Sequence, residues 1–143
     1  MKNLAGILDT KDAEILSDAL WAWANLIESD TICLSELLGK FPGKNLKEFL
    51  CSDSEILMGS TLRFIGNICV SSDPIVTTFI SDDILKCFTK ILSTKVSEEI
   101  IKECCLIVHN FAIGPSTHAE RLVSLGLFDS LCNILININN NSV

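Results

Sequence analysis

Apolar residues along this chain recur with the spacing of amphipathic helices, and the pattern itself repeats with a long period. Three asparagines mark the period, because Asn25 and Asn67 lie 42 positions apart and Asn67 and Asn110 lie 43 positions apart. Counted from each asparagine, the positions nine, five and two before it and one after it are apolar in every copy. These positions share one broad stripe of a 3.6-residue helix. The pattern predicts three long helices that each bury one face.

The two faces of these helices differ in composition. The apolar positions, which we expect in the core, are Leu16, Leu20, Trp23 and Leu26, then Met58, Leu62, Ile65 and Ile68, then Ile101, Cys105, Val108 and Phe111. The positions four and seven before each asparagine, which we expect to face solvent or a ligand, are Trp21 and Asp18, Arg63 and Ser60, and Leu106 and Glu103. Residues two apart point about 200° apart around a helix. Trp23 is therefore predicted in the core and Trp21 on the exposed face with Asn25.

The length of the period indicates the fold class. Repeats of about 40–47 residues are typical of the helical HEAT and armadillo proteins. We predict an all-α solenoid with about three repeats' worth of helices, forming a single domain over residues 1–136. Its predicted units are a partial repeat at 1–28, repeats at 29–72 and 73–115, and a partial repeat at 116–136, followed by an Asn-rich flexible tail at 137–143.

Local capping and breaking signals place the helix ends. The long helices are expected from a cap at Thr10 or Asp12 to Ile27, from a cap within 52–54 to Cys69, and from Ser97 onwards. Shorter helices are expected over 33–38 with a break at Pro42-Gly43, over 45–51, from Asp73-Pro74 to about 82–83, and over 84–92. A capping box of Thr117 and Glu120 is predicted to open the fourth unit, and Gly126 to separate its two helices.

Charge and hydropathy narrow the possible partners. The 18 acidic residues outnumber the 11 basic ones, which gives a net charge of −7. This balance argues against nucleic acid and anionic membranes as partners, because binding to phosphate needs lysine and arginine, and it is compatible with basic partners. The longest uncharged run, 104–119, contains polar residues and is not expected to span a membrane.

Candidate catalytic and metal-binding chemistry is sparse. The seven cysteines include no CxxC pair and several occupy apolar positions, so they are interpreted as reduced core thiols of a cytosolic or nuclear protein. No metal or other cofactor is expected. His109 and His118 lack partners in the pattern and are interpreted as structural or surface residues. No nucleophile–base pair stands out, so we do not expect an enzyme.

Three segments carry a resemblance to a known family. Residues 18–25 (DALWAWAN), 62–67 (LRFIGN) and 102–110 (KECCLIVHN) are similar to the third helices of the importin-α (karyopherin-α) armadillo proteins. In that family a tryptophan four residues before an asparagine recurs along a groove, and central repeats carry an LRxxGN version. The resemblance covers nearly all of 2–136. It implies a right-handed superhelix and an adaptor that binds basic nuclear localisation signals and works in the cytoplasm and nucleus.

The resemblance also implies a peptide-binding site on the third helices. It places Asn25, Asn67 and Asn110 in an asparagine ladder that holds the peptide backbone, and Trp21 in a tryptophan array that packs basic side chains. A carboxamide both donates and accepts hydrogen bonds, so it can grip a peptide N–H and C=O together. The acidic residues Asp18, Glu28 and Glu103 could pair with basic side chains. Arg63 and Leu106 stand where the family has tryptophan, and Arg63 would repel a lysine there.

Several alternatives stay open at this point. The asparagines could instead satisfy loop carbonyls of the next unit, and Trp21 could serve only as packing between helices. Asp18 and Glu103 could be ordinary solvated charges, while Arg63 could form a salt bridge with either of them across the groove.

A second function is also compatible with the pattern. The chain could be a non-catalytic scaffold or degenerate armadillo fragment that acts through self-association or another partner protein. Incomplete cover of apolar residues in the last unit would favour self-association through an end of the solenoid; these residues are Leu127, Phe128 and Leu131.

Overall fold

A computed structural model describes residues 6–29, 34–39, 41, 45–71 and 73–140. Throughout this part of the chain every regular element is a helix, as predicted. The helices are α2 (Ala13–Glu28), α3 (Leu34–Gly39), α4 (Leu46–Leu50), α5 (Glu55–Cys69), α6 (Asp73–Phe79), α7 (Asp82–Leu92), α8 (Glu98–Ala112), α9 (Ser116–Ser124) and α10 (Leu127–Asn140).

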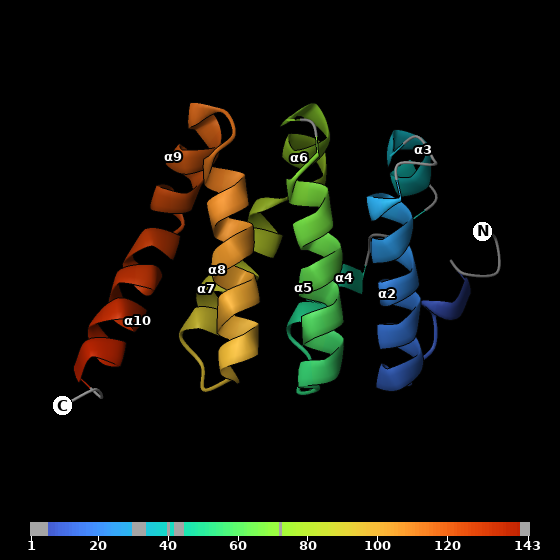
Figure 1. Ribbon diagram of the computed structural model, residues 1–143, viewed down its shortest axis with the longest axis horizontal. Coiled ribbons are helices and arrows are strands. Elements are labelled where there is room, and N and C mark those ends of the chain that lie inside the picture. Colours follow the sequence, from blue (N-terminus) through green and yellow to red (C-terminus); the bar gives the residue numbers. More distant parts are fainter. Residues whose placement is uncertain (1–5, 30–33, 40, 42–44, 72, 141–143) are drawn as a thin grey trace.

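The helices stack as successive three-helix units (Figure 1). The long helices α2, α5 and α8 stand side by side, and each packs against the corresponding helix of the next unit. Behind them, α4 packs against α7 and α7 against α10, which forms a second layer. The short helices α3, α6 and α9 lie at one end of the long ones (Figure 1). This arrangement places one face of all three long helices on the same side of the molecule.

Side-chain caps fix where two of the three long helices, α2 and α5, begin. Of the two predicted caps of α2, Asp12 is the one used: its Oδ1 accepts hydrogen bonds from the N–H groups of Glu14 and Ile15. Ser54 caps α5 in the same way. Ser97 precedes α8 without a side-chain cap, and its own N–H instead donates to Glu55 Oε1 at 3.1 Å, at the start of α5. The starts of two successive long helices are thus joined directly.

An aromatic cluster forms the centre of the core. Trp23 is fully buried and meets Phe41 edge-on with ring centroids 5.2 Å apart, and Phe41 stacks on Phe64 at 4.4 Å. Edge-on and stacked pairs of this kind add to the free energy gained from burial. Trp21 is 44% exposed. The prediction that the two tryptophans face opposite ways is confirmed.

The predicted apolar columns are buried or packed against the core; three members are only partly buried, namely Leu26, Ile101 and Cys105. The prediction for the opposite face was wrong at Ser60, which is buried. Its hydroxyl donates to the Leu57 carbonyl one turn earlier at 3.0 Å, so this small polar side chain is satisfied within its own helix.

Two predicted helix ends were wrong. The short helix of the third unit ends at Phe79, because Ser81 caps the next helix, α7. Asp82 and Asp83 form the first turn of α7, where acidic side chains interact favourably with the helix dipole. Thr117 is not a cap, because α9 already begins at Ser116 after Pro115 and Thr117 lies inside the first turn.

The last unit differs from the prediction in its second half. Gly126 separates α9 from α10 as predicted, with a φ of +73° that favours glycine. Helix α10 continues to Asn140, past residue 137 where a tail was predicted, since neither glycine nor proline interrupts it. Leu127 is fully buried rather than uncovered, whereas Phe128 is exposed. The predicted break at Pro42-Gly43 lies outside the described residues.

Candidate functional site

The predicted site residues all lie on three adjacent helices, which we call the third-helix face. The residues are Asp18, Trp21, Asn25 and Glu28 on α2, Arg63 and Asn67 on α5, and Glu103 and Asn110 on α8. These helices pack side by side, so the face crosses three successive units (Figure 1). Asp18, Trp21, Asn25 and Glu28 are exposed, and the asparagines of α5 and α8 are half-buried.

Arg63 links the three helices across this face. Its guanidinium carbon lies 5.8 Å from the centroid of the Trp21 ring, and its Nη2 lies 3.2 Å from Glu103 Oε1. The salt bridge that the sequence left open is therefore formed with Glu103. The Arg63 and Glu103 side chains are 43% and 27% exposed, so solvent screens the pair and its contribution is at most about 1 kcal/mol. The contacts nevertheless order Trp21, Arg63 and Glu103 in one row.

The three asparagines are not equivalent. Asn67 Nδ2 donates to the Ala24 carbonyl at 3.0 Å and so ties α5 to α2. Asn67 thus satisfies a backbone carbonyl, as one of the two alternatives proposed. The carbonyl belongs to the preceding long helix, however, and not to a loop of the next unit. Among the described residues, the side chains of Asn25 and Asn110 have no hydrogen-bond partner. Their carboxamides are therefore available to a ligand.

A hollow next to Asn110 was not predicted from the sequence. It encloses about 510 Å³ and is lined by Cys69, Val70, Ser71, Val76, Asn110, Ile113, Gly114, Pro115 and His118. Its rim is apolar, because Val70 and Ile113 are 71% and 70% exposed. These residues occur three positions after an asparagine, where α2 carries Glu28. Comparing the residues three positions after each asparagine could have revealed that the acidic Glu28 is replaced by an apolar residue in the two later units.

His118 closes the floor of this hollow and has a structural role there. It is 1% exposed, its ring stacks on Phe111 with centroids 4.1 Å apart, and its Nε2 lies 2.7 Å from Thr77 Oγ1. The interpretation of His118 as a structural residue agrees with these contacts. His109 is exposed at the end of α8.

In the ranges that the structure describes, no group of three or more His, Cys, Asp or Glu side chains could hold a metal ion. None of the helices in those ranges has both the length and the apolar character needed to cross a membrane.

Solved structures with the same stack of three-helix units define the class of protein. A crystal structure of computationally designed armadillo repeat proteins for modular peptide recognition matches 94% of this chain and 56% of its own, with a TM-score of 0.82 and 24% identity. A designed armadillo repeat protein in complex with the peptide (KR)4 matches 92% of this chain and 55% of its own, with a TM-score of 0.82 and 25% identity. The chain is an armadillo-repeat solenoid.

Within this class the sequence is similar to importin α. Importin subunit alpha-1a of Oryza sativa subsp. japonica is 26% identical over 130 residues, which are 91% of this chain and 25% of the relative. Importin subunit alpha-1b of the same organism is 28% identical over 107 residues, 73% of this chain and 20% of the relative. The chain thus spans about a quarter or less of the length of these relatives. No protein-family model matches it.

Proposed function

We propose that the third-helix face binds an extended peptide rich in lysine and arginine, such as a nuclear localisation signal. The protein would then act as an importin-α-like adaptor for nuclear protein import, in the cytoplasm and nucleus, and not as an enzyme. The observation that carries this proposal is the group on α2, where the exposed Trp21 and Asn25 lie one turn apart between the exposed carboxylates of Asp18 and Glu28.

The chemistry of this group suits a basic peptide. The face of Trp21 can take the alkyl stem of a lysine and attract its ammonium, a contact worth about 0.5–2 kcal/mol. Asp18 and Glu28 add attraction that salt would screen. The Asn25 carboxamide can bond to the peptide backbone without regard to sequence.

The spacing of the long helices suits an extended peptide as well. Packed helices are about 8–10 Å apart, and an extended chain rises about 3.3 Å per residue. Successive asparagines would therefore meet the peptide about every three residues. The designed armadillo repeat protein bound to (KR)4 supports a basic peptide as a ligand for this fold.

Arg63 modifies this proposal, because it already occupies the position of a bound basic side chain. It contacts Trp21 and pairs with Glu103. An incoming lysine would compete with Arg63 for both partners, so we expect binding to be weaker than a full tryptophan row would give. Replacing the arginine, as in Arg63→Gln, is expected to tighten binding of a lysine-rich peptide by about 3–10-fold, because it frees both groups and removes a like charge.

Intrinsic tryptophan fluorescence tests the proposal, because Trp21 is exposed while Trp23 is buried and serves as a constant background. A lysine-rich localisation peptide should give a saturable change that weakens as salt is raised. Asn25→Ala should weaken binding by about 5–20-fold, the loss of one or two hydrogen bonds. Asn133→Ala is the matched control, because Asn133 is an exposed asparagine on α10, outside the third-helix face. A flat titration up to near-millimolar peptide would refute the proposal.

A second candidate function is a non-catalytic scaffold that self-associates. The observation that favours it is an apolar strip on α10, where Phe128, Leu135 and Ile136 are exposed. Light scattering at increasing protein concentration tests it. A mass that rises in the wild type and stays monomeric in Phe128→Ser would support self-association through this strip, and a strict monomer at high concentration would exclude it.

A further inference from the structure

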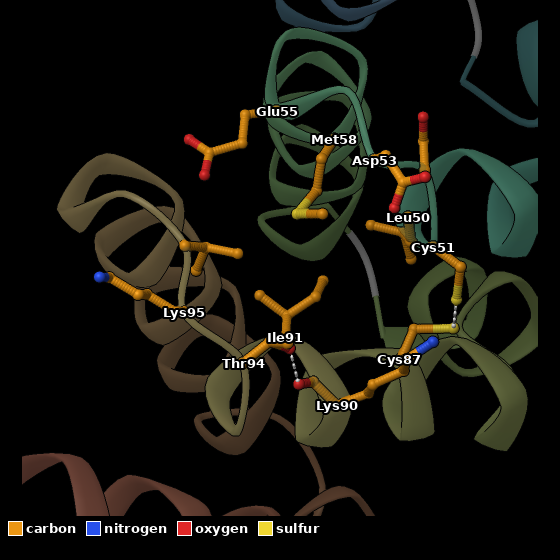
Figure 2. Close-up of a pocket in the computed structure, with 12 residues that line it drawn as sticks. Leu50, Cys51, Asp53, Glu55, Met58, Cys87, Lys90, Ile91, Thr94 and Lys95 are labelled. Atoms are coloured by element: carbon orange, nitrogen blue, oxygen red, sulfur yellow. Dashed lines mark hydrogen bonds between the residues drawn. The ribbon is translucent and has the colours of Figure 1, made fainter.

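Two cysteines from successive units meet behind the third-helix face. Cys51 follows the last turn of α4 and Cys87 lies on α7, and their Sγ atoms are 3.7 Å apart. Figure 2 shows the two sulfurs pointing toward each other at the edge of a cavity of about 210 Å³. Cys51 is exposed and Cys87 is buried. Among the described cysteines, Cys51 and Cys87 are the two whose sulfur atoms are in contact.

We propose that Cys51 and Cys87 form an oxidation site that converts reversibly to a disulfide between units. A disulfide needs an S–S distance of about 2.05 Å, so the sulfurs must approach each other by about 1.7 Å. Cys51 is well placed to move, because it is the C-terminal cap of a five-residue helix and is exposed on the surface. Helix α4 already packs against α7, which keeps the two cysteines side by side.

The exposed and the buried thiol have different roles in the reaction. The oxidant is a peroxide: the Cys51 thiolate attacks one oxygen of H₂O₂ and the O–O bond breaks. The departing hydroxide takes up the proton that Cys51 lost on ionising, which leaves a sulfenic acid and one water. Cys87 sulfur then attacks Cys51 sulfur, and the sulfenic oxygen leaves with the thiol proton as a second water. Two thiols lose two electrons in total, and one peroxide is reduced to two waters. A thiol reductant reverses the modification by disulfide exchange.

The surroundings of Cys87 fit the role of the second thiol. Burial, and secondarily its hydrogen bond with Cys51, raises the pKa of Cys87 to about 12, so Cys87 stays protonated at neutral pH and is not the thiol that peroxide oxidises first; its attack on Cys51 relies on proximity. Its Sγ also lies 3.2 Å from the Asp83 carbonyl, to which it donates. Cys87 is therefore a protected thiol that solvent oxidants do not reach first. Its geometry keeps it beside the one sulfur that it would attack.

The disulfide would close a loop across two units. The two cysteines are 36 positions apart, and closing a loop of this length restricts the unfolded chain considerably. We expect oxidation to raise Tm by about 5–15 °C. Because α4 and α7 lie in the layer behind α5 and α8, the bond would also fix the angle between two units of the solenoid.

Peptide mapping tests the proposal directly, because trypsin cleavage after Lys47, Arg63, Lys86 and Lys90 isolates each cysteine. Cys51 falls in peptide 48–63 and Cys87 in peptide 87–90. After treatment with stoichiometric H₂O₂, we expect these two peptides to appear as one cross-linked species that has lost two hydrogens and separates on reduction. The rise in Tm should accompany it and disappear with the same reductant.

Variants separate this site from general thiol oxidation. Cys51→Ser should abolish both the cross-link and the rise in Tm, and Cys87→Ala should leave Cys51 as a sulfenic acid that dimedone traps. Cys132→Ser, which removes a partly exposed cysteine of α10, should behave as wild type. The proposal is overturned if wild-type Cys51 proceeds to sulfinic acid without a cross-link, if either peptide joins another cysteine, or if both thiols stay reduced.

Discussion

Two glycine-to-alanine changes should have opposite effects on stability, although each adds the same methyl group. A Cβ at Gly66, in the middle of α5, would lie 3.5 Å from Ile107 Cγ1, which is ordinary van der Waals contact. A Cβ at Gly114, just after α8, would lie 2.6 Å from His118 Nδ1 and 3.4 Å from the Phe111 carbonyl. The first position has room for a methyl group and the second does not.

His118 cannot move aside to relieve the clash. Its ring is buried, stacks on Phe111 and lies within hydrogen-bond distance of Thr77, so a shift of the ring would disturb both contacts. Overpacking of this kind costs about 1–3 kcal/mol. Alanine recovers about 0.4–1 kcal/mol by restricting the unfolded chain. We therefore expect Gly114→Ala to lower the free energy of unfolding by about 1–2 kcal/mol.

Gly66→Ala should instead raise the free energy of unfolding by about 0.5–1 kcal/mol, because alanine favours a helix interior over glycine. Urea denaturation followed by circular dichroism measures both variants, and equal m-values would show that the unfolded states are comparable. Changes of the same sign in the two variants would refute the reasoning. A stable Gly114→Ala would mean that His118 is not held rigidly, and a destabilised Gly66→Ala would mean that α5 and α8 pack more tightly than the structure shows.

Three further predictions concern side chains with defined partners. Arg121→Lys should cost about 1–2 kcal/mol, because the arginine bonds both a backbone carbonyl and a carboxylate beside the start of α7; urea denaturation measures it. A double-mutant cycle of Arg63 and Glu103 should give a coupling below about 1 kcal/mol that shrinks in about 0.5 M NaCl. Burial raises the pKa of Cys104, so its stabilising effect is complete below the unfolded pKa and is lost as pH rises above about 9. In urea denaturation at pH 9–11, wild type should lose up to about 1.4 kcal/mol per pH unit more than Cys104→Ala.

The repeat pattern predicted the parts of the fold that depend on helix geometry alone. Trp21 and Trp23 must point apart on any α-helix, and the apolar columns decide which one is buried. The start of α2 at Asp12 follows from the same local chemistry of caps. Local signals failed where one segment fitted two roles: Asp82 and Asp83 looked like the end of one helix, yet they begin the next after Ser81.

Contacts between units were beyond sequence reasoning, because they depend on the offset between packed helices. Nothing local distinguishes Asn67, which donates to the Ala24 carbonyl, from Asn25, whose side chain has no hydrogen-bond partner in the described part of the chain. The approach of Cys51 to Cys87 likewise depends on how α4 settles on α7. Comparing equivalent positions of the repeats suggested that Arg63 pairs with Asp18 or Glu103. Only the packing of α5 on α8 determines that the partner is Glu103.

The third-helix face changes from acidic at its α2 end to apolar at its α8 end, and this change affects how the proposed peptide would lie. Three positions after the asparagine, α2 carries Glu28, while the later long helices are followed by Val70 and Ile113. Arg63 stands in the middle with its charge already matched by Glu103. A lysine of the proposed peptide would therefore find attraction at the α2 end, competition in the middle and a hollow with an apolar rim at the α8 end. On these grounds, a peptide with basic residues at one end and apolar residues at the other suits this face better than a uniformly basic one.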